Sequence, residues 1–125
     1  MATTTLSAND FDSIVSADGI VLVDFWAAWC GPCRAFAPTF EAASEANPDI
    51  VFGKVDTEAE QALAGAAGIR SIPTLMAFRD GILVFNQAGA LPPAALNQVI
   101  DAVRGLDMDD VRTKVAEAQA QASAG

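Results

Sequence analysis

The sequence predicts a single α/β domain in which a central mixed β-sheet is flanked by helices on both faces. Apolar runs of strand length alternate with segments of helical spacing, which favours parallel strands joined by crossovers. The last two runs are joined through Asp80 and Gly81, a pair typical of a hairpin turn, which adds an antiparallel part. The chain has enough apolar residues to form a hydrophobic core, because 52% of its 125 residues are hydrophobic.

Two helices and two strands are expected in the first half of the chain, after a short extended start. Ser7 and Asp10 have the spacing of a capping box, which predicts a first helix. Residues 20–27 form a nearly continuous apolar run, as in a central strand buried on both faces. Helical spacing follows over 32–47, and residues 49–56 predict a second buried strand.

The second half predicts a helix, a hairpin and a further helix. Thr57 and Glu60 have the spacing of another capping box and open an Ala-rich helical segment over 58–68. Residues 74–89 hold the two alternating apolar runs of the hairpin. The segment 93–105 begins with proline and ends with glycine, as helices often do. The expected order is therefore β-α-β-α-β-α-β-β-α.

The composition changes after Gly105, so we expect a domain over 1–105 and a C-terminal extension over 106–125. The extension predicts a partly helical segment from Asp107 that becomes mobile where the sequence turns to Ala, Gln and Ser. One face of that segment carries an apolar stripe of Met108, Val111 and Val115.

Charge and targeting signals narrow the possible classes of protein. A net charge of -9 without a basic stripe argues against nucleic acid as a partner. No apolar run approaches the roughly 18 residues of a membrane-spanning helix, and the N-terminal segment lacks the features of a secretory signal. We therefore expect a monomeric, cytoplasmic protein that binds neither membrane nor nucleic acid.

The two cysteines, Cys30 and Cys33, lie in the segment FWAAWCGPCRAF, where the expected strand leads into a helix. Such a pair could bind zinc, but zinc takes four ligands, and the chain has no His and no third Cys. A purely structural disulfide is another alternative, although so short a loop removes little chain entropy. Redox chemistry is the favoured interpretation, because a helix N-terminus lowers the pKa of Cys30 and places Cys33 to resolve a mixed disulfide.

The segment VDFWAAWCGPCR resembles the active-site signature of the thioredoxin family, and SIPT at 71–74 and QAGA at 87–90 resemble its substrate-binding loops. The resemblance covers about residues 4–105. It implies the thioredoxin fold and a protein-disulfide reductase in which Cys30 attacks and Cys33 resolves. It implies no cofactor and no metal. The partners that it implies are disulfide-containing client proteins and a thioredoxin reductase.

Asp24 is an unexpected carboxylate in a strand that should be buried on both faces. Desolvation should raise its pKa, so that it could hold and pass a proton near neutral pH. The resemblance implies that Asp24 lies behind Cys33 and acts as its general base, with Lys54 tuning the charge of Asp24. A structural carboxylate satisfied by hydrogen bonds is the alternative.

The resemblance also implies a substrate-binding surface around the dithiol. Pro73 is expected to be a cis proline facing the cysteines, with the backbone of Ile72 pairing with an extended client segment. Two residues depart from the common family pattern. Arg34 replaces a frequent lysine and keeps a positive charge near Cys33, while Ala67 replaces a larger residue, which predicts a more open groove rim. The expected contact surface comprises Trp29, Gly31, Pro32, Ile72, Pro73, Gly89 and Ala90.

Reduction is the predicted direction of the exchange. The Gly31-Pro32 spacer contains no His that would stabilise a thiolate further, which favours the reducing end of the range. A disulfide oxidase or isomerase is the nearest alternative. A binding module whose redox chemistry is incidental is the second, because fold alone does not define function.

Overall fold

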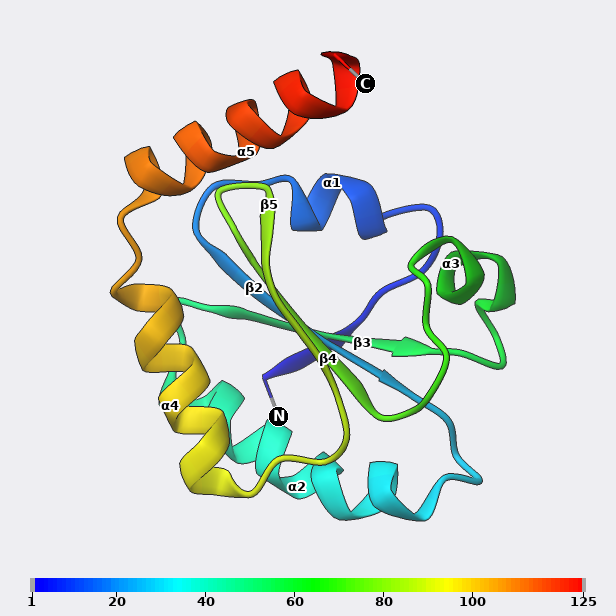
Figure 1. Ribbon diagram of the computed structural model, residues 1–125. Coiled ribbons are helices and arrows are strands. Elements are labelled where there is room, and N and C mark those ends of the chain that lie inside the picture. The colour runs from blue at the N-terminus through cyan, green and yellow to red at the C-terminus, as the bar shows by residue number, and fades with distance from the viewer. Residues whose placement is uncertain (1, 125) are drawn as a thin grey trace.

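The computed structural model describes residues 2–124 and shows a five-stranded mixed sheet between two layers of helices (Figure 1). The predicted α/β class and the order of elements are confirmed. The strands are β1 (Thr3–Thr5), β2 (Ile20–Trp26), β3 (Val51–Asp56), β4 (Thr74–Arg79) and β5 (Ile82–Ala88). The helices are α1 (Phe11–Val15), α2 (Gly31–Ala46), α3 (Gln61–Ala66), α4 (Pro93–Arg104) and α5 (Met108–Ala124).

The strands lie in the order β1-β3-β2-β4-β5. β1, β3 and β2 are parallel, and β4 pairs antiparallel with both β2 and β5. The predicted hairpin turn is confirmed: Asp80 and Gly81 have φ of 53° and 80°, the two positive values that a tight hairpin turn requires. β2 therefore lies at the centre, with a neighbour on each side.

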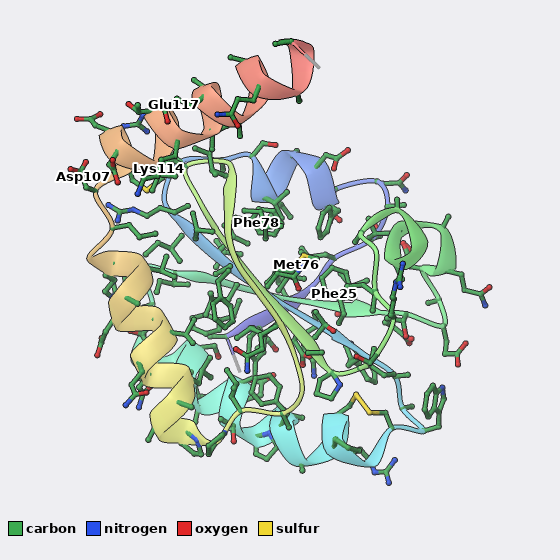
Figure 2. All side chains as sticks on the ribbon, in the orientation of Figure 1. Phe25, Met76, Phe78, Asp107, Lys114 and Glu117 are labelled. Carbon is green, nitrogen blue, oxygen red and sulfur yellow. A yellow bond between two sulfur atoms is a disulfide. The ribbon has the colours of Figure 1, made fainter. Side chains whose placement is uncertain are left out.

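Two apolar clusters cover the two faces of the sheet. α2 and α4 pack Phe36, Phe40 and Leu96 against one face, which includes Leu22 of β2. α1 and α3 cover the other face, where Phe25, Met76 and Phe78 project from the sheet (Figure 2). Successive residues of a strand point to opposite faces. Asp24 therefore shares the face of Leu22, toward the layer that contains α2.

Polar groups next to the helix starts account for the local turns. The Asp10 carboxylate accepts the Ser7 N–H at 2.7 Å, which fits the spacing predicted for this pair, although α1 itself begins only at Phe11. The capping box predicted from Thr57 and Glu60 is wrong. The Thr57 hydroxyl donates to a carbonyl of β2, and Asp56 accepts the N–H groups that follow the strand.

The extension forms one helix, α5, that runs to Ala124, further than its Ala- and Gln-rich sequence predicts. Asp107 caps its start by accepting the N–H groups of Asp109 and Asp110. Met108 is buried, whereas Val111 and Val115 are half-buried, so the predicted stripe faces the protein. Figure 1 shows α5 crossing above the β4–β5 hairpin.

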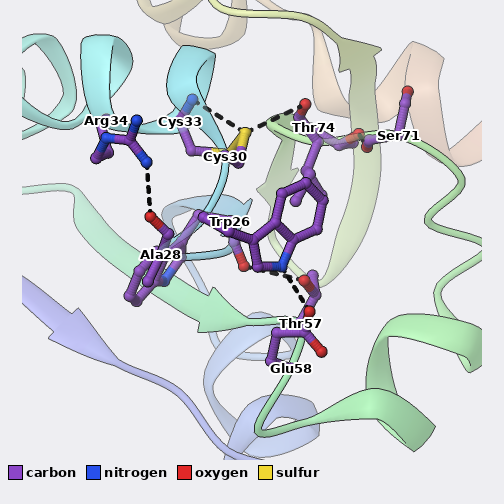
Figure 3. Close-up of a disulfide and its surroundings, with 11 residues drawn as sticks. Trp26, Ala28, Cys30, Cys33, Arg34, Thr57, Glu58, Ser71 and Thr74 are labelled. Carbon is purple, nitrogen blue, oxygen red and sulfur yellow. Dashed lines mark hydrogen bonds between the residues drawn. A yellow bond between two sulfur atoms is a disulfide. The ribbon is translucent and has the colours of Figure 1, made fainter.

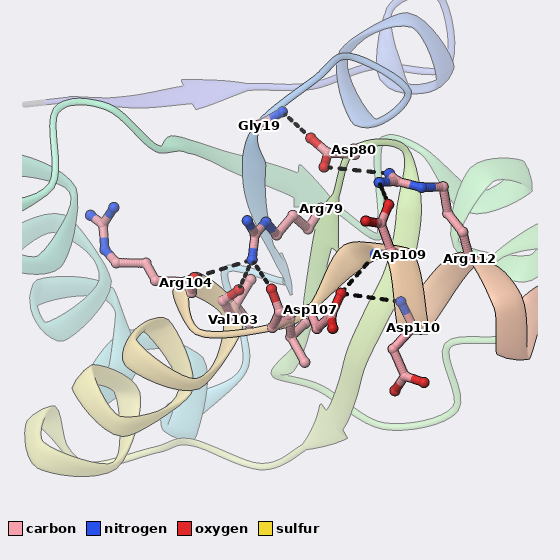
Figure 4. Close-up of polar contacts among 10 residues, drawn as sticks. Gly19, Arg79, Asp80, Val103, Arg104, Asp107, Asp109, Asp110 and Arg112 are labelled. Atoms are coloured by element: carbon pink, nitrogen blue, oxygen red, sulfur yellow. Dashed lines mark hydrogen bonds and ion pairs between the residues drawn. The ribbon is translucent and has the colours of Figure 1, made fainter.

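Arg79, the last residue of β4, joins the sheet to the end of α4. Its guanidinium donates to the carbonyl oxygens of Val103, Arg104 and Leu106 at 2.8, 3.1 and 2.9 Å (Figure 4). Those carbonyls lie at and just beyond the end of α4, where intrahelical donors run out. The Arg79 guanidinium thus provides hydrogen bonds to the carbonyl groups of the turn that leads into α5.

Candidate active site

The start of α2 places the two cysteines. Cys30 is the N-cap residue with extended backbone, and Pro32 lies in the first turn of the helix, where proline is favoured. Cys30 and Cys33 form a disulfide, and their Cα atoms are 5.2 Å apart. The Cys33 N–H donates to Cys30 Sγ at 3.2 Å (Figure 3). Cys30 and Cys33 are 4% and 2% exposed, so their positions on the helix, not their burial, distinguish them.

The segment around Pro73 closes over the disulfide. The Ile72-Pro73 peptide bond is cis, as the resemblance implies. The Ile72 carbonyl oxygen lies 3.6 Å from Cys30 Sγ, within reach of a thiol proton when the disulfide is reduced. The Gly89 N–H donates to the Pro73 carbonyl oxygen at 2.8 Å. This bond joins the two loops that the sequence assigned to substrate binding.

Trp29 stands beside the disulfide with 67% of its surface exposed. Its indole N–H donates to Glu58 at 2.5 Å, which holds the ring in place while leaving it accessible. Trp26 is half-buried and packs against the cysteines, in agreement with its expected place in the core. The exposed residues of the predicted contact surface are Trp29, Gly31, Pro32, Gly89 and Ala90.

Asp24 is fully buried in β2, and neither of its carboxylate oxygens has a hydrogen-bond partner among residues 2–124. Burial raises the pKa of Asp24 to about 7, and the nearby positive charge of Lys54 opposes that rise. Lys54 pairs with Asp24 in the parallel ladder, and its ammonium lies 4.9 Å from the centre of the Trp26 ring. Within residues 2–124 no group supplies the hydrogen bonds that the structural alternative for Asp24 would require.

Arg34 is exposed on the first turn of α2, on the segment that contains Cys33. Its guanidinium donates to the Ala28 carbonyl oxygen at 2.8 Å (Figure 3). The contact restrains the loop that leads to Cys30 and keeps a positive charge near the disulfide.

The side chains of the described residues were also compared with the requirements of a metal site and of a membrane-spanning helix. Across residues 2–124, no group of three or more His, Cys, Asp or Glu side chains is placed to hold a metal ion. The same part of the chain has no helix with the length and apolar character needed to cross a membrane.

Two residues near the disulfide were missed by sequence reasoning. Glu58 orients Trp29, and Arg70 lines a pocket that Trp29 also lines. Nothing in the local pattern marked either one, although Arg70 directly precedes the SIPT segment. The open rim predicted from Ala67 is not formed by that residue, which packs on the apolar cluster beneath α1 and α3. Ala64 and Gly65 line the pocket instead.

These contacts define a class of protein. A disulfide at a helix N-terminus can open reversibly, because the first-turn N–H groups stabilise the thiolate that leaves. Trp29 beside the disulfide, and Gly31 and Pro32 between its two cysteines, are exposed. The protein is a thiol-disulfide oxidoreductase.

Comparisons with known proteins identify the family. The thioredoxin family model matches residues 2–102. The chain is 60% identical over 121 residues to a protein named putative thioredoxin 2 from Streptomyces coelicolor, covering 97% of this chain and 90% of that one. It is 48% identical over 82 residues to thioredoxin 1 of Synechococcus elongatus, covering 65% of this chain and 77% of the relative.

Solved structures of thioredoxins have the same fold as this chain. A thioredoxin from Plasmodium falciparum superposes with a TM-score of 0.73 at 37% identity, covering 80% of this chain and 97% of that one. A Malassezia sympodialis thioredoxin superposes with a TM-score of 0.73 at 34% identity, covering 80% and 89%. The chain belongs to the thioredoxin family, whose members are protein-disulfide reductases.

Proposed function

We propose that this protein reduces the disulfides of client proteins, with Cys30 as nucleophile and Cys33 as resolving thiol. The Cys30 thiolate attacks one client sulfur, forming a Cys30-client disulfide and breaking the client S–S bond. The client thiolate that leaves takes up a proton. Cys33 then attacks Cys30 Sγ as a thiolate, restores the Cys30-Cys33 disulfide and releases the second client thiolate, so that two electrons pass to the client.

The observation that carries these roles is the position of Cys30 at the N-cap of α2. Its sulfur accepts the Cys33 N–H at 3.2 Å, so a negative charge there gains a hydrogen bond and the favourable end of the helix dipole. Cys33 lies one turn further into the helix and is not at the N-cap. Cys30 is therefore the thiol that ionises first.

Asp24 is proposed as the group that accepts the Cys33 proton when Cys33 attacks. A base works best when its pKa lies near the operating pH, and burial brings the pKa of Asp24 to about 7. Its side chain faces the α2 layer that contains Cys33. Lys54, paired with Asp24 in the sheet, tempers the rise in pKa and so keeps part of the carboxyl population ionised.

The client is proposed to lie across the exposed residues beside the disulfide. The Ile72 backbone, next to Cys30 Sγ, pairs with an extended client segment as an added strand would. The faces of Trp29 and Pro32 and the backbone of Gly31, Gly89 and Ala90 complete this surface, while Arg34 holds the Cys30 loop.

A cycle of reduction needs a source of electrons. We propose that a thioredoxin reductase returns the disulfide to the dithiol, that the protein acts as a monomer in the cytoplasm, and that 1–105 suffice for catalysis while 106–125 are an extension. The clients themselves are proteins with accessible disulfides.

The test is reduction of insulin disulfides, followed by the turbidity of the released B chain. Reduced wild-type protein supplied with NADPH and a bacterial thioredoxin reductase should precipitate insulin through many turnovers. Reduction with dithiothreitol but not with the reductase would contradict the proposed recharging. Absence of reduction with either electron source would contradict the proposed activity.

A further inference from the structure

A pocket of about 360 Å³ lies between Trp29 and α3, beside the disulfide. Ile72 lines this pocket, and its carbonyl oxygen is 3.6 Å from Cys30 Sγ. A side chain that enters the pocket therefore belongs to a residue close in sequence to the client cysteine under attack. The lining residues are Trp29, Thr57, Gln61, Ala64, Gly65, Ile69, Arg70, Ser71 and Ile72.

Small residues leave the pocket open. Ala64 contributes only a methyl group, and a Cβ added at Gly65 would meet no atom within 4 Å. Trp29, held by its bond to Glu58, forms a fixed wall with 67% of its surface exposed. The pocket can therefore admit a client side chain without moving α3.

Arg70 is the charged residue among those that line the pocket. It is exposed, and within residues 2–124 it forms no hydrogen bond or ion pair. The carboxylates of the preceding loop are already engaged: Glu58 with the Trp29 indole, Asp56 with backbone N–H groups and Glu60 with the Ala8 N–H. The Arg70 guanidinium is therefore available to a group of a bound client.

We propose that Arg70 is a specificity-determining residue that favours client disulfides with an Asp or Glu close to the attacked cysteine. This inference rests on the proposed reductase function and names its substrate class. Ile72 and Arg70 are two residues apart, so their Cα atoms lie at most about 7 Å from each other. An antiparallel client would thus bring a carboxylate within about two residues of its cysteine to the guanidinium. The exchange itself is unchanged; the ion pair only aligns the client sulfur with Cys30.

The experiment uses synthetic peptides with one cysteine held as a mixed disulfide with thionitrobenzoate. The Cys30 thiolate attacks the peptide sulfur, forms the Cys30-peptide disulfide and releases coloured thionitrobenzoate, which gives a second-order rate constant. Matched peptides carry Glu or Gln at one of four positions, one or two residues before or after the cysteine. The readout is the ratio of the Glu rate to the Gln rate within each variant.

For the wild type at low salt we expect a ratio of about two to five at one or more positions, as an exposed ion pair provides. The ratio should fall toward one in 0.5 M NaCl, because salt screens exposed charges. The net charge of -9 would by itself repel the Glu peptide and give a ratio below one. A ratio above one therefore reports a local contact.

Arg70→Gln should bring the ratio to about one or below, and Arg70→Lys should retain a ratio above one. Arg112→Gln is the matched control, since it removes the same charge from α5 and should keep both the ratio and the rates of the wild type. A wild-type ratio of one or less at all four positions overturns the inference, as does a ratio unchanged by Arg70→Gln in protein with native near-UV circular dichroism. Failure of reduced wild type to release thionitrobenzoate from any peptide would instead contradict the proposed function, and the inference with it.

Discussion

The two ends of the central sheet differ in how their polar side chains are paired. At the end where β2 leads to the disulfide, the Asp24 carboxylate and the Arg70 guanidinium have no hydrogen-bond partner within residues 2–124. At the opposite end, Arg79 contacts three carbonyl oxygens, and Arg104 pairs with Asp49 through both carboxylate oxygens. The Arg104 bond accordingly lowers the pKa of Asp49.

The difference separates groups that hold the fold together from groups that are kept for chemistry. A buried polar group without a partner destabilises the folded state, so a sequence keeps one only where it serves another purpose. Paired groups at the Arg79 end join β4, α4 and α5 (Figure 4). Removing the Asp24 carboxylate should therefore stabilise the protein, whereas removing the Arg79 guanidinium should destabilise it.

Cys30→Ser should have the largest effect on the disulfide end, because it removes the attacking sulfur. Insulin reduction should fall to the background given by the reductant alone, while the fold persists. Cys33→Ser should leave attack intact and accumulate a Cys30-client disulfide, visible as a mass adduct that dithiothreitol removes. An adduct formed by Cys30→Ser and not by Cys33→Ser would reverse the two proposed roles.

Asp24→Asn should stabilise the oxidised protein at neutral and higher pH. In the folded state the pKa of Asp24 is about 7, against 3.8 for the ordinary group, so the folded state binds more protons between these values. Stability contributed by this group therefore falls as pH rises from about 4 to about 7, by roughly 4 kcal/mol in all, and changes little above that. Urea unfolding of both proteins at pH 4 and pH 8 measures the difference.

The two unfolding curves should be close at pH 4 and separated by several kcal/mol at pH 8, with Asp24→Asn the more stable. If the difference in free energy of unfolding between the wild type and Asp24→Asn were the same at pH 4 and pH 8, Asp24 would have an ordinary pKa. For the rate of insulin reduction we expect the opposite order, with the wild type faster than Asp24→Asn. Asp24→Asn should slow insulin reduction by about 100-fold or more if the carboxyl carries the proton.

Arg79→Gln should destabilise the protein, in contrast to Asp24→Asn. One guanidinium nitrogen lies within 3.1 Å of three carbonyl oxygens at and just beyond the end of α4, and glutamine cannot reach all three. We expect a loss of about 2 kcal/mol in urea unfolding. Unchanged stability would mean that water satisfies these carbonyls equally well.

Arg112→Gln should have the smallest effect. Its contacts with Asp80 and Asp109 are at 3.9 and 3.0 Å, and its side chain is 53% exposed. Exposed pairs contribute little, so the change should stay within about 1 kcal/mol. A larger loss would show that this pair, rather than the apolar contacts of Met108, fixes α5.

Much of this arrangement was predictable from the sequence because local patterns encode it. The Asp80-Gly81 turn, the proline and glycine that bound α4 and the apolar run of β2 each depend on neighbours in the chain. The cysteine pair was recognisable for the same reason. Burial of Asp24 followed from its place in an apolar run, and with it the rise in its pKa.

The features that escaped prediction depend on directions in space. Asp56 and Thr57 are both suitable caps, and only the path of the chain after β3 turns Asp56 toward the free N–H groups. Glu58 and Arg70 gain their roles from Trp29 and the pocket, which are distant in sequence. The start of α5 is held by the cap at Asp107 and by burial of Met108, neither of which its Ala- and Gln-rich end reveals.

The reduction potential of the Cys30-Cys33 couple decides whether the protein acts as a reductase. Protein equilibrated with graded dithiol and glutathione buffers, then trapped and weighed by mass spectrometry, gives the midpoint. We expect a strongly reducing value, near the figure of about −270 mV that is typical of thioredoxins. A midpoint at or above about −180 mV would indicate an oxidase or isomerase instead, and a pair that never forms the disulfide would leave a binding module as the function.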